Sequence, residues 1–479
     1  MLFYLILSLY LLSLLLIPAV IMRKKEPASA LAWIIAIIFL PIIGAFFYLL
    51  FGTERITNEA KKKSVFNKEI RKRLQSIEAG WALKDLPKKK RDLPESIVNI
   101  IRVSSELGPF GAVEGNSFEI LVNAEEAYPR MKEAILSAKD HINLESYIYN
   151  PDDTGAEFAD LLAHKARQGI KVHLLYDAVG SVRFGLSRSL LNKLRSAGVK
   201  VKDFLPLHTI FFKPWNANLR NHRKILVVDG KIGFTGGLGI GDDFLNDRSS
   251  DGWRDTHVIF QGPAVDQLQW VFCEDWDFAT GEELFTENYF PPTELNGNKT
   301  AQIVPCGPDE VLDPIHKVFV AAISQSKSSV YLTTPYFIPD KAIFVALQLA
   351  ALRGVDVRLL LPRKSDHRFV LLAGRSYYEE LLQSGIRIFE YVPSILHAKM
   401  LVVDSNFVVN GSANMDIRSF DYDFEANAQV YDEEFAKRAE KVFFADLQNS
   451  HEVSLDVVSN RPAYVRFSEN LCRLLSALL

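Results

Sequence analysis

The chain contains few cysteines and carries little net charge. Its three cysteines, Cys273, Cys306 and Cys472, are odd in number and lack C-x-x-C spacing, so they indicate neither a disulfide framework nor a zinc site. The formal net charge of -3 gives no support for nucleic acid as the main partner. With 479 residues, the chain is long enough for an enzyme of more than one domain.

The chain also lacks the glycine motifs of nucleotide-binding proteins. Glycines cluster between Gly233 and Gly241, but Asp242 stands where G-x-G-x-x-G requires its last glycine, and no GK[ST] follows. We interpret this stretch as a turn that brings backbone amides towards a phosphate. A tight structural turn is compatible with the same residues.

What the chain has in excess is apolar sequence at its N-terminus. Residues 2–22 and 29–51 contain no charged residue, and each run is long enough to cross about 30 Å of hydrocarbon as a helix. We therefore expect a transmembrane helical hairpin over residues 1–52. A cleaved signal peptide is the competing interpretation, but no basic segment precedes the first run. Pro41 and Gly44 also allow a kinked or re-entrant second segment.

Basic residues flank this hairpin unequally. Arg23, Lys24 and Lys25 lie between the two runs, whereas a larger group of lysines and arginines follows Phe51. The larger group predicts a multi-pass protein of the cell membrane whose remaining chain is cytoplasmic, although the three charges of the loop argue the other way. The basic residues belong to a linker and leading segment expected over residues 53–109. They suit contact with anionic lipid headgroups and, equally, a solvated linker.

The rest of the chain contains an internal duplication. Residues 134–177 and 321–362 follow one order: a helical stretch, a β-branched and aromatic run, an apolar helix and a second strand. Each apolar helix ends at a glycine, Gly169 or Gly354, which is a common stop signal.

Alternating strands and helices predict an α/β fold with two duplicated domains. We place the first domain at residues 110–295 and the second at residues 296–479. Equivalent strand ends are expected to face each other, so that the two domains form one composite site.

Each domain carries the pattern H-x-K-x-x-x-x-D. The residues of the pattern are His222, Lys224 and Asp229 in the first domain, and His397, Lys399 and Asp404 in the second. Because side chains alternate along a strand, the histidine and lysine of each copy project to the same face. The aspartates can equally close a turn, bind backbone or touch substrate. A structural role for either copy is conceivable, but its repetition favours a shared catalytic site.

Paired histidines and lysines suit phosphoryl transfer. Lysine is a compact positive charge, and two lysines can stabilise the charge that develops on a phosphoryl group, so that no metal or cofactor is required. One imidazole can attack phosphorus and form a phosphohistidine, while the other protonates the departing alkoxide and later deprotonates the incoming alcohol. We prefer His222 as the nucleophile and His397 as the acid and base, although the reverse assignment remains open.

These motifs resemble those of the phospholipase D superfamily, whose signature is the doubled H-x-K-x-x-x-x-D followed by G-[SG]-x-N. The second copy continues with Gly411-Ser412-Ala413-Asn414, whereas the first continues with Gly236-Gly237-Leu238-Gly239. Gly239 therefore stands where the superfamily usually has asparagine. The resemblance implies supporting roles for Gly237, Ser412 and Asn414, and the departure at Gly239 removes one expected phosphate contact.

The superfamily also orients each catalytic histidine with a carboxylate further along the chain. The resemblance carries this role onto Asp255 and Glu425. A carboxylate on the second ring nitrogen would fix the tautomer and stabilise an imidazolium.

Within the superfamily, the chain resembles the bacterial cardiolipin synthases over nearly its whole length. The similar segments are PASALAW at residues 27–33, the closing LFG at 50–52, GFTGGLGIGDDFL at 233–245 and NMDIRSFDYDFEANAQVYD at 414–432. The resemblance implies a membrane-bound transferase whose substrate is phosphatidylglycerol: two molecules are joined into cardiolipin and glycerol is released. The amphipathic C-terminal tail from Tyr464 can lie at the bilayer surface or face the core.

Other functions remain possible on the same residues. A phospholipase D that uses water as the acceptor would need no change in the site, and a membrane scaffold without turnover is favoured only by Gly239. A nuclease is disfavoured because the chain lacks a strong basic excess. The sequence does not indicate the oligomeric state.

Overall fold

The computed structural model describes residues 2–23, 27–49, 63, 93–207, 219–246, 252–310 and 312–474. The first half of its α/β body contains these strands: β1 (Val113–Val122), β2 (His141–Ser146), β3 (Lys171–Asp177), β4 (Lys200–Phe204), β5 (Arg220–Asn221), β6 (Lys224–Val228), β7 (Ile232–Gly236) and β8 (Thr256–Gln261). Its helices are α7 (Asn123–Ser137), α8 (Asp153–Arg167), α9 (Val182–Leu186), α10 (Arg188–Ser196), the 3-10 turn η4 (Asp242–Phe244) and α12 (Ala264–Thr280).

The second half repeats this plan. Its strands are β9 (Lys299–Cys306), β10 (Ser329–Thr333), β11 (Phe337–Ile338), β12 (Asp356–Pro362), β13 (Arg387–Tyr391), β14 (Met400–Val403), β15 (Phe407–Gly411), β16 (Met415–Asp416), β17 (Asp423–Tyr431) and β18 (Ser450–Glu452). Its helices are α13 (Pro314–Gln325), α14 (Lys341–Leu352), α15 (Arg368–Arg375), α16 (Tyr378–Gln383), α17 (Ile417–Asp421), α18 (Glu433–Gln448), α19 (Leu455–Ser459) and α20 (Ala463–Leu474).

The strand order shows the duplication directly. The first half runs β1-β8-β7-β6-β2-β3-β4, and the second runs β9-β17-β15-β14-β10-β12-β13. In both halves the strands after the crossover helices are parallel, and the motif strand β6 or β14 lies antiparallel beside β2 or β10. β1 joins the halves, because its last residues pair with β8 and its first residues pair with β9. The predicted α/β fold with two duplicated domains is confirmed.

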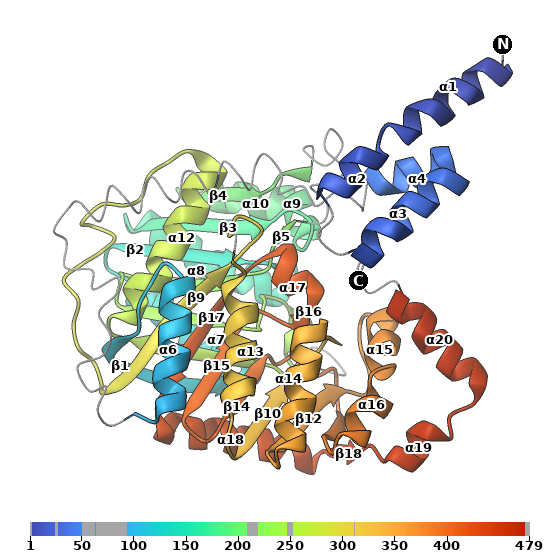
Figure 1. The fold of residues 1–479 in the computed structure, drawn as a ribbon. Helices are drawn as coiled ribbons and strands as arrows, with labels where there is room; N and C mark the ends of the chain where they lie inside the picture. Colours follow the sequence, from blue (N-terminus) through green and yellow to red (C-terminus); the bar gives the residue numbers. More distant parts are fainter. Residues whose placement is uncertain are drawn as a thin grey trace.

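Helices cover these strands in layers. The core between the halves contains α12 and α18 packed against strand residues of both halves, including Val227 and Val402. A second core lies under α7 and α8, and a third lies under α6 (Glu95–Leu107), α13 and α14, which Figure 1 shows side by side over one face. Burying the large rings of Trp270 and Trp276 in the central layer contributes about 2–3 kcal/mol each.

The predicted helix stops are also confirmed. Helix α8 begins where the Asp152 carboxylate accepts a hydrogen bond from the amide of Gly155, and Gly169 follows its end with φ 91°. Helix α14 begins with the same cap at Asp340, and Gly354 follows it with φ 87°. Only glycine adopts such angles without steric strain, so these two residues end the crossover helices at equivalent places.

The N-terminal apolar runs differ from the two continuous helices that we expected. The first run forms α1 (Leu2–Leu14) and α2 (Ile17–Arg23), and the second forms α3 (Pro27–Phe39) and α4 (Pro41–Phe47). Pro18 and Pro41 lack the backbone N–H that would continue each helix. No helix in the described part of the chain has both the length and the apolarity required to cross a membrane.

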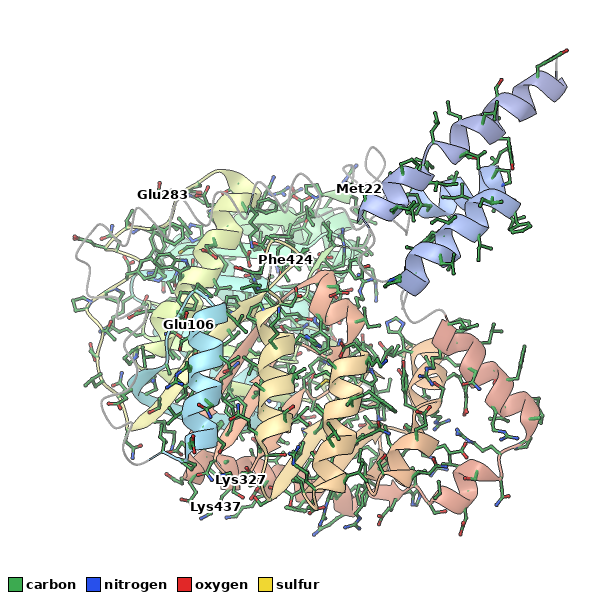
Figure 2. All side chains as sticks on the ribbon, viewed as in Figure 1. Met22, Glu106, Glu283, Lys327, Phe424 and Lys437 are labelled. Carbon is green, nitrogen blue, oxygen red and sulfur yellow. The ribbon has the colours of Figure 1, made fainter. Side chains whose placement is uncertain are left out.

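The second run is broken at Pro41 and folds back on itself, so that α3 and α4 contact each other. A Cβ atom at Gly44 would lie 2.3 Å from the carbonyl oxygen of Ala36, so only glycine permits α4 to lie this close to α3. The helices α1 to α4 project from the α/β body (Figure 1), and Met22, labelled in Figure 2, is 85% exposed.

Two segments outside the repeats pack on the second half. Helix α6 precedes β1 in the chain, yet Ile97 and Ile101 lie in the core under α13, so the expected linker over residues 53–109 ends in a structural helix. The rest of that linker lies outside the described residues, apart from Lys63, residues 93–94 and residues 108–109. Helix α20 packs on α15 through Cys472, while Tyr464 remains 75% exposed.

Candidate active site

The backbone brings each motif histidine to the opposite half of the molecule. The amide of His222 donates to the carbonyl of Phe424 at 2.9 Å, and the amide of His397 donates to the carbonyl of Arg254 at 2.7 Å. β5, just before His222, pairs in parallel with the start of β17, and Leu396 forms the equivalent bridge with Arg254. Phe424 therefore lies where the two halves meet (Figure 2).

This backbone pairing between the two halves decides which carboxylate contacts which histidine. The Nδ1 atom of His222 lies 2.9 Å and 3.1 Å from the two carboxylate oxygens of Glu425, and the Nδ1 atom of His397 lies 2.6 Å from Asp255. The sequence placed a carboxylate downstream of each histidine without showing the partner. In the fold, each histidine pairs with the carboxylate of the other half, so neither half contains a complete site.

The lysines stand beside the histidines and are 3% exposed. The ammonium group of Lys224 donates to the carbonyl of His222 at 2.6 Å, and Lys399 contacts the carbonyl of His397 at the same distance. Lys399 also lies 3.0 Å from Nε2 of His397. Among the described residues, Lys224 makes no equivalent contact with Nε2 of His222. The two imidazoles are therefore not equivalent.

Burial controls the ionisation of these groups. It lowers the pKa of His222 to about 3 and that of His397 to about 4, against the opposing effect of their carboxylates. Burial would raise the pKa of Glu425, but the contact with His222, the charge of Lys224 and the hydrogen bond from Ser412 outweigh it and lower that pKa. Because an ionised carboxylate only accepts hydrogen bonds, Nδ1 of each neutral imidazole carries the proton and Nε2 presents a lone pair.

Comparisons with known proteins agree with this geometry. Residues 131–276 and 319–447 match the family model of the cardiolipin synthase, PLD-like domain, and residues 3–52 match that of the phospholipase D-nuclease N-terminal region. A cardiolipin synthase of Geobacillus kaustophilus is 38% identical over 462 residues, which cover 96% of this chain and 90% of that protein. This chain belongs to the cardiolipin synthase family. The resemblance predicted from the doubled motif is confirmed.

Two further proteins extend this comparison. The major cardiolipin synthase ClsA of Bacillus subtilis is 36% identical over 486 residues, which cover 98% of each chain. The crystal structure of a phosphatidylserine synthase from Haemophilus influenzae has a TM-score of 0.59 at 13% identity, and the match covers 80% of this chain and 100% of that chain. The second likeness shows that the duplicated fold is shared.

In this member of the cardiolipin synthase family, the residues after each motif hold the carboxylates differently. The hydroxyl of Ser412 donates to Glu425, and the amide of Ala426 donates to that hydroxyl at 3.0 Å. The equivalent Gly237 lies against the shorter Asp255, and a Cβ atom there would lie 2.1 Å from a carboxylate oxygen. Serine supports the longer carboxylate, whereas glycine leaves room for the shorter one.

We expect Gly237→Ala to reduce cardiolipin formation about a hundredfold, because the methyl group would push Asp255 away from His397. Ser412→Ala, the matched change in the other half, should cost only about tenfold, since it removes one hydrogen bond to a carboxylate. Initial rates measure both effects, and thermal melting by circular dichroism controls for folding. Equal losses in the two variants would contradict the steric role of Gly237.

The structure explains the departure at Gly239. A Cβ atom at this position would lie 2.9 Å from Cβ of Ile148 and 3.0 Å from the ring of Phe244, so an asparagine has no room there. The carbonyl of Gly239 instead accepts a hydrogen bond from the hydroxyl of Tyr128 at 2.9 Å. The equivalent Asn414 is buried, with its side-chain oxygen unpaired among the described residues.

The motif aspartates lie at the other end of their strands from the lysines. The carboxylate of Asp229 accepts hydrogen bonds from the amides of residues 139–141, and Asp404 accepts from the amides of residues 327–329. Both residues follow the strand with φ near +50°, at 53° and 52°. The sequence left three roles open for these aspartates, and the structure shows them binding backbone. They tie the motif strand to the start of β2 or β10.

Aromatic rings beside the histidines were missed by sequence reasoning. The ring centroid of Tyr147 lies 4.8 Å from that of His222, and the centroid of Trp253 lies 4.8 Å from that of His397. Tyr336 lies on another side of His397, at 6.4 Å. Each ring is far from its histidine in the sequence. No motif or spacing identifies these aromatic residues.

A buried ion cluster behind His222 was missed for the same reason. Arg223 forms an ion pair with Asp275 and donates to the carbonyl of Glu425 at 3.0 Å. Lys63, which the sequence placed in the basic linker, lies 2.5 Å from Asp275 and 4.4 Å from the ring centroid of Phe424. These charges support the backbone that carries Glu425.

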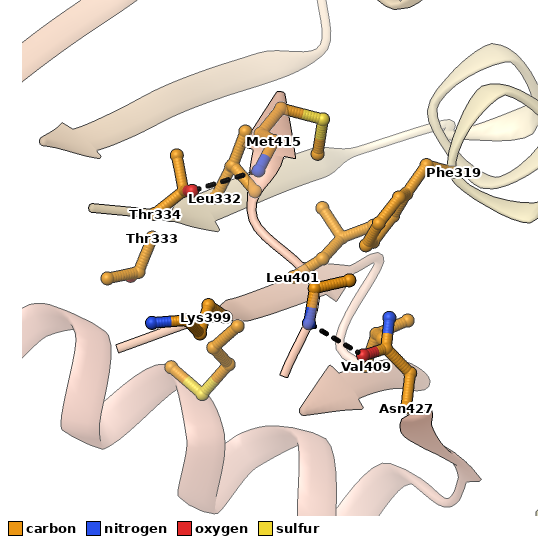
Figure 3. Close-up of a pocket in the computed structure, with 11 residues that line it drawn as sticks. Phe319, Leu332, Thr333, Thr334, Lys399, Leu401, Val409, Met415 and Asn427 are labelled. Atoms are coloured by element: carbon orange, nitrogen blue, oxygen red, sulfur yellow. Dashed lines mark hydrogen bonds between the residues drawn. The ribbon is translucent and has the colours of Figure 1, made fainter. Parts of the chain in front are cut away.

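A small cavity borders the second motif strand (Figure 3). Lys399 is the only charged residue in its mostly apolar lining, and every lining residue belongs to the second half. The amide of Met415 donates to the Thr334 hydroxyl at 3.1 Å, and the amide of Ala413 donates to the Asn427 side chain at 3.3 Å. The cavity is therefore part of the second core, whereas the composite site needs groups from both halves.

The lysines predict an alkaline limit to activity. Burial lowers the pKa of Lys224 to about 7 and that of Lys399 to about 8. KM should therefore rise as the pH rises through 7 to 8, because in the free enzyme each lysine loses the charge that binds the phosphodiester, while a pKa of about 3 keeps the His222 nucleophile neutral far below pH 6.5. Lys224→Arg should move the alkaline limit upwards. A pH profile that stays flat above these values would contradict this prediction.

Proposed function

We propose that this enzyme is a membrane-bound phosphatidyltransferase that joins two phosphatidylglycerol molecules into cardiolipin and releases glycerol. The observation that carries the proposal is the pair of histidines, each hydrogen-bonded to a carboxylate of the opposite half and each followed by a buried lysine. The membership in the cardiolipin synthase family supplies the reaction class.

In the first step, Nε2 of His222 attacks the phosphorus of the donor phosphatidylglycerol. A P–N bond forms, the P–O bond to glycerol breaks, and the glycerol oxygen takes a proton from His397. The phosphodiester anion between Lys224 and Lys399 raises the pKa of His397, so that this imidazole holds a proton when substrate is bound. Glu425 and Asp255 stabilise the positive charge on their imidazoles.

In the second step, His397 takes the proton from a hydroxyl of the second phosphatidylglycerol. The resulting oxygen attacks phosphorus, the P–N bond breaks, and His222 is regenerated as a neutral imidazole. The contact of Lys399 with Nε2 of His397, which His222 lacks among the described residues, favours His222 as the nucleophile because its lone pair stays free.

We also propose that helices α1 to α4 anchor the enzyme in the cell membrane, with the α/β body in the cytoplasm. These helices expose many large apolar side chains, including Leu11, Leu12, Phe39 and Phe46. Exposed apolar surface of this extent is typical of contact with lipid. The basic residues that follow α4 in the sequence favour the cytoplasmic side, and they suit anionic lipid headgroups.

Product analysis tests the proposed reaction. The full-length enzyme, supplied with phosphatidylglycerol in mixed detergent micelles, should form cardiolipin and glycerol in equal amounts. Free phosphatidic acid as the main product would instead establish a hydrolase that uses water. If neither glycerol nor cardiolipin appears, the chain is a scaffold without turnover.

A further inference from the structure

The two flanks of the active site carry opposite charges. Near Tyr147, whose ring contacts His222, the guanidinium of Arg418 lies 3.2 Å from the carboxylate of Asp423 and is 30% exposed. On the other flank, the ring of Tyr336 lies near His397, and its hydroxyl donates to the carboxylate of Asp366. The cation therefore lies near the proposed nucleophile, and the anion lies near the proposed acid and base.

The Tyr336–Asp366 pair is held by several hydrogen bonds and is partly open to solvent. The Tyr336 hydroxyl lies 2.9 Å and 2.8 Å from the two oxygens of Asp366, which also accept from the Ser365 hydroxyl at 3.2 Å and from the amide of His367 at 3.1 Å. The Asp366 side chain remains 26% exposed, and Nε2 of the exposed His367 ring lies 3.5 Å from its Oδ2. A carboxylate can accept about four hydrogen bonds, so Asp366 can bind a further donor from the open side.

The charges on the two flanks differ at neutral pH. Burial would raise the pKa of Asp366, but the nearby His367 and His397 outweigh it, so the pKa is lowered and the carboxylate is ionised. On the other flank, burial raises the pKa of Asp416 to about 6 and holds that of Asp423 well above its usual range. Arg418 therefore contributes a positive charge on the Tyr147 side of the site, and Asp366 contributes a negative charge beyond His397.

The duplication is broken at this point. Ser146 and Thr334 occupy equivalent places, since their hydroxyls donate to the carbonyls of Ile148 and Tyr336. Ile148 therefore stands where the second half has Tyr336, and it packs against Gly239. The first half cannot form an equivalent tyrosine–carboxylate pair.

We propose that Asp366, held by Tyr336, is the subsite for the headgroup of the acceptor lipid, and that it recognises a vicinal diol. This inference rests on the proposed function. One hydroxyl of the acceptor glycerol approaches Nε2 of His397, which removes its proton, and the neighbouring hydroxyl donates to Asp366. A carboxylate accepts hydroxyl donors and repels phosphate, so it favours the neutral end of a second phosphatidylglycerol over the donor phosphodiester.

Such a subsite gives the acceptor lipid an advantage over water. A diol bound through one hydroxyl has its other hydroxyl held near phosphorus, which raises its effective concentration at the phosphohistidine. Water and simple alcohols gain nothing from the second hydrogen bond. The subsite thereby favours transfer to a glycerol headgroup over hydrolysis.

Competition between acceptors tests this subsite. The full-length enzyme is supplied with phosphatidylglycerol and ethanol in mixed micelles, and cardiolipin, phosphatidylethanol and phosphatidic acid are quantified. Asp366→Asn should lower the ratio of cardiolipin to phosphatidylethanol about tenfold or more, because ethanol lacks the second hydroxyl. Tyr336→Phe should lower the same ratio by a smaller factor, since Asp366 keeps its other contacts.

A second tyrosine–aspartate pair provides the matched control. The hydroxyl of Tyr331, in the middle of β10, donates at 3.1 Å to Asp356, which begins β12 at the end far from the site. Asp356→Asn and Tyr331→Phe should leave the ratio of products unchanged.

The outcomes separate this inference from the proposed function. If the unmodified enzyme forms cardiolipin and Asp366→Asn keeps the ratio of the unmodified enzyme, the subsite is overturned while the transferase remains. If the unmodified enzyme forms no cardiolipin, the proposed function itself fails. A ratio that falls equally in Asp366→Asn and in Asp356→Asn would show a structural effect and would also overturn the subsite.

Discussion

His222→Ala is expected to abolish formation of the phosphoenzyme and to reduce cardiolipin synthesis by at least about four orders of magnitude. The imidazole of His222 is the proposed nucleophile, and its removal leaves Glu425 without the ring that it orients. His397→Ala should reduce synthesis by a similar factor, because protonation of the glycerol oxygen is lost. Overall rates therefore do not separate the two roles.

A substrate with a better leaving group separates them. A phosphatidyl ester of nitrophenol releases nitrophenolate without protonation, so His397→Ala should still give a burst of one nitrophenolate per active site. His222→Ala should give none. The phosphohistidine trapped in His397→Ala should map to residue 222. A burst in His222→Ala and none in His397→Ala would assign the nucleophile to His397.

The second large effect is expected from the carboxylates. Glu425→Gln should reduce turnover about ten-thousandfold, because the amide no longer fixes the tautomer of His222 or stabilises its positive charge. Asp255→Asn should act in the same way on His397. Both replacements keep the size of the side chain, so folding should be retained, which thermal melting checks.

The nitrophenyl ester shows which histidine each carboxylate serves. Glu425→Gln should slow the burst of nitrophenolate, because it weakens the nucleophile. Asp255→Asn should leave the rate of the burst unchanged and slow only the turnover of phosphatidylglycerol. The reverse pattern, in which Asp255→Asn slows the burst, would mean that each carboxylate serves the histidine of its own half. The exchanged pairing of the two halves would then be wrong.

Much of the fold can be predicted from local sequence. Gly169 and Gly354 end equivalent helices because the backbone there is left-handed, a conformation that glycine adopts without strain. The residue type alone therefore marks the helix end. The alternation of His222 and Lys224 along a strand likewise follows from local geometry. These features depend on neighbours within a few residues, which is why the duplicated α/β fold was predictable.

Other features depend on residues that are distant in the chain. Gly239 signalled a missing polar contact, but only the packed structure shows Ile148 and Phe244 in the space that an asparagine would need. Pro41 and Gly44 allowed a kinked or re-entrant segment in place of a continuous span, and the close approach of Gly44 to Ala36 shows that the chain folds back there. When two conformations have similar local energy, such tertiary contacts decide which one forms.

By itself, the sequence determined the duplicated fold, the family and the histidine–lysine pairs, because periodicity, helix stops and short motifs are local properties. Only the tertiary structure decided that His222 meets Glu425 and His397 meets Asp255, and that the motif aspartates hold backbone amides. The physical reason is that the residues just before each histidine pair with backbone of the other half: β5 pairs with β17, and Leu396 forms a bridge with Arg254. No local pattern encodes a contact between surfaces that meet only after both halves have folded.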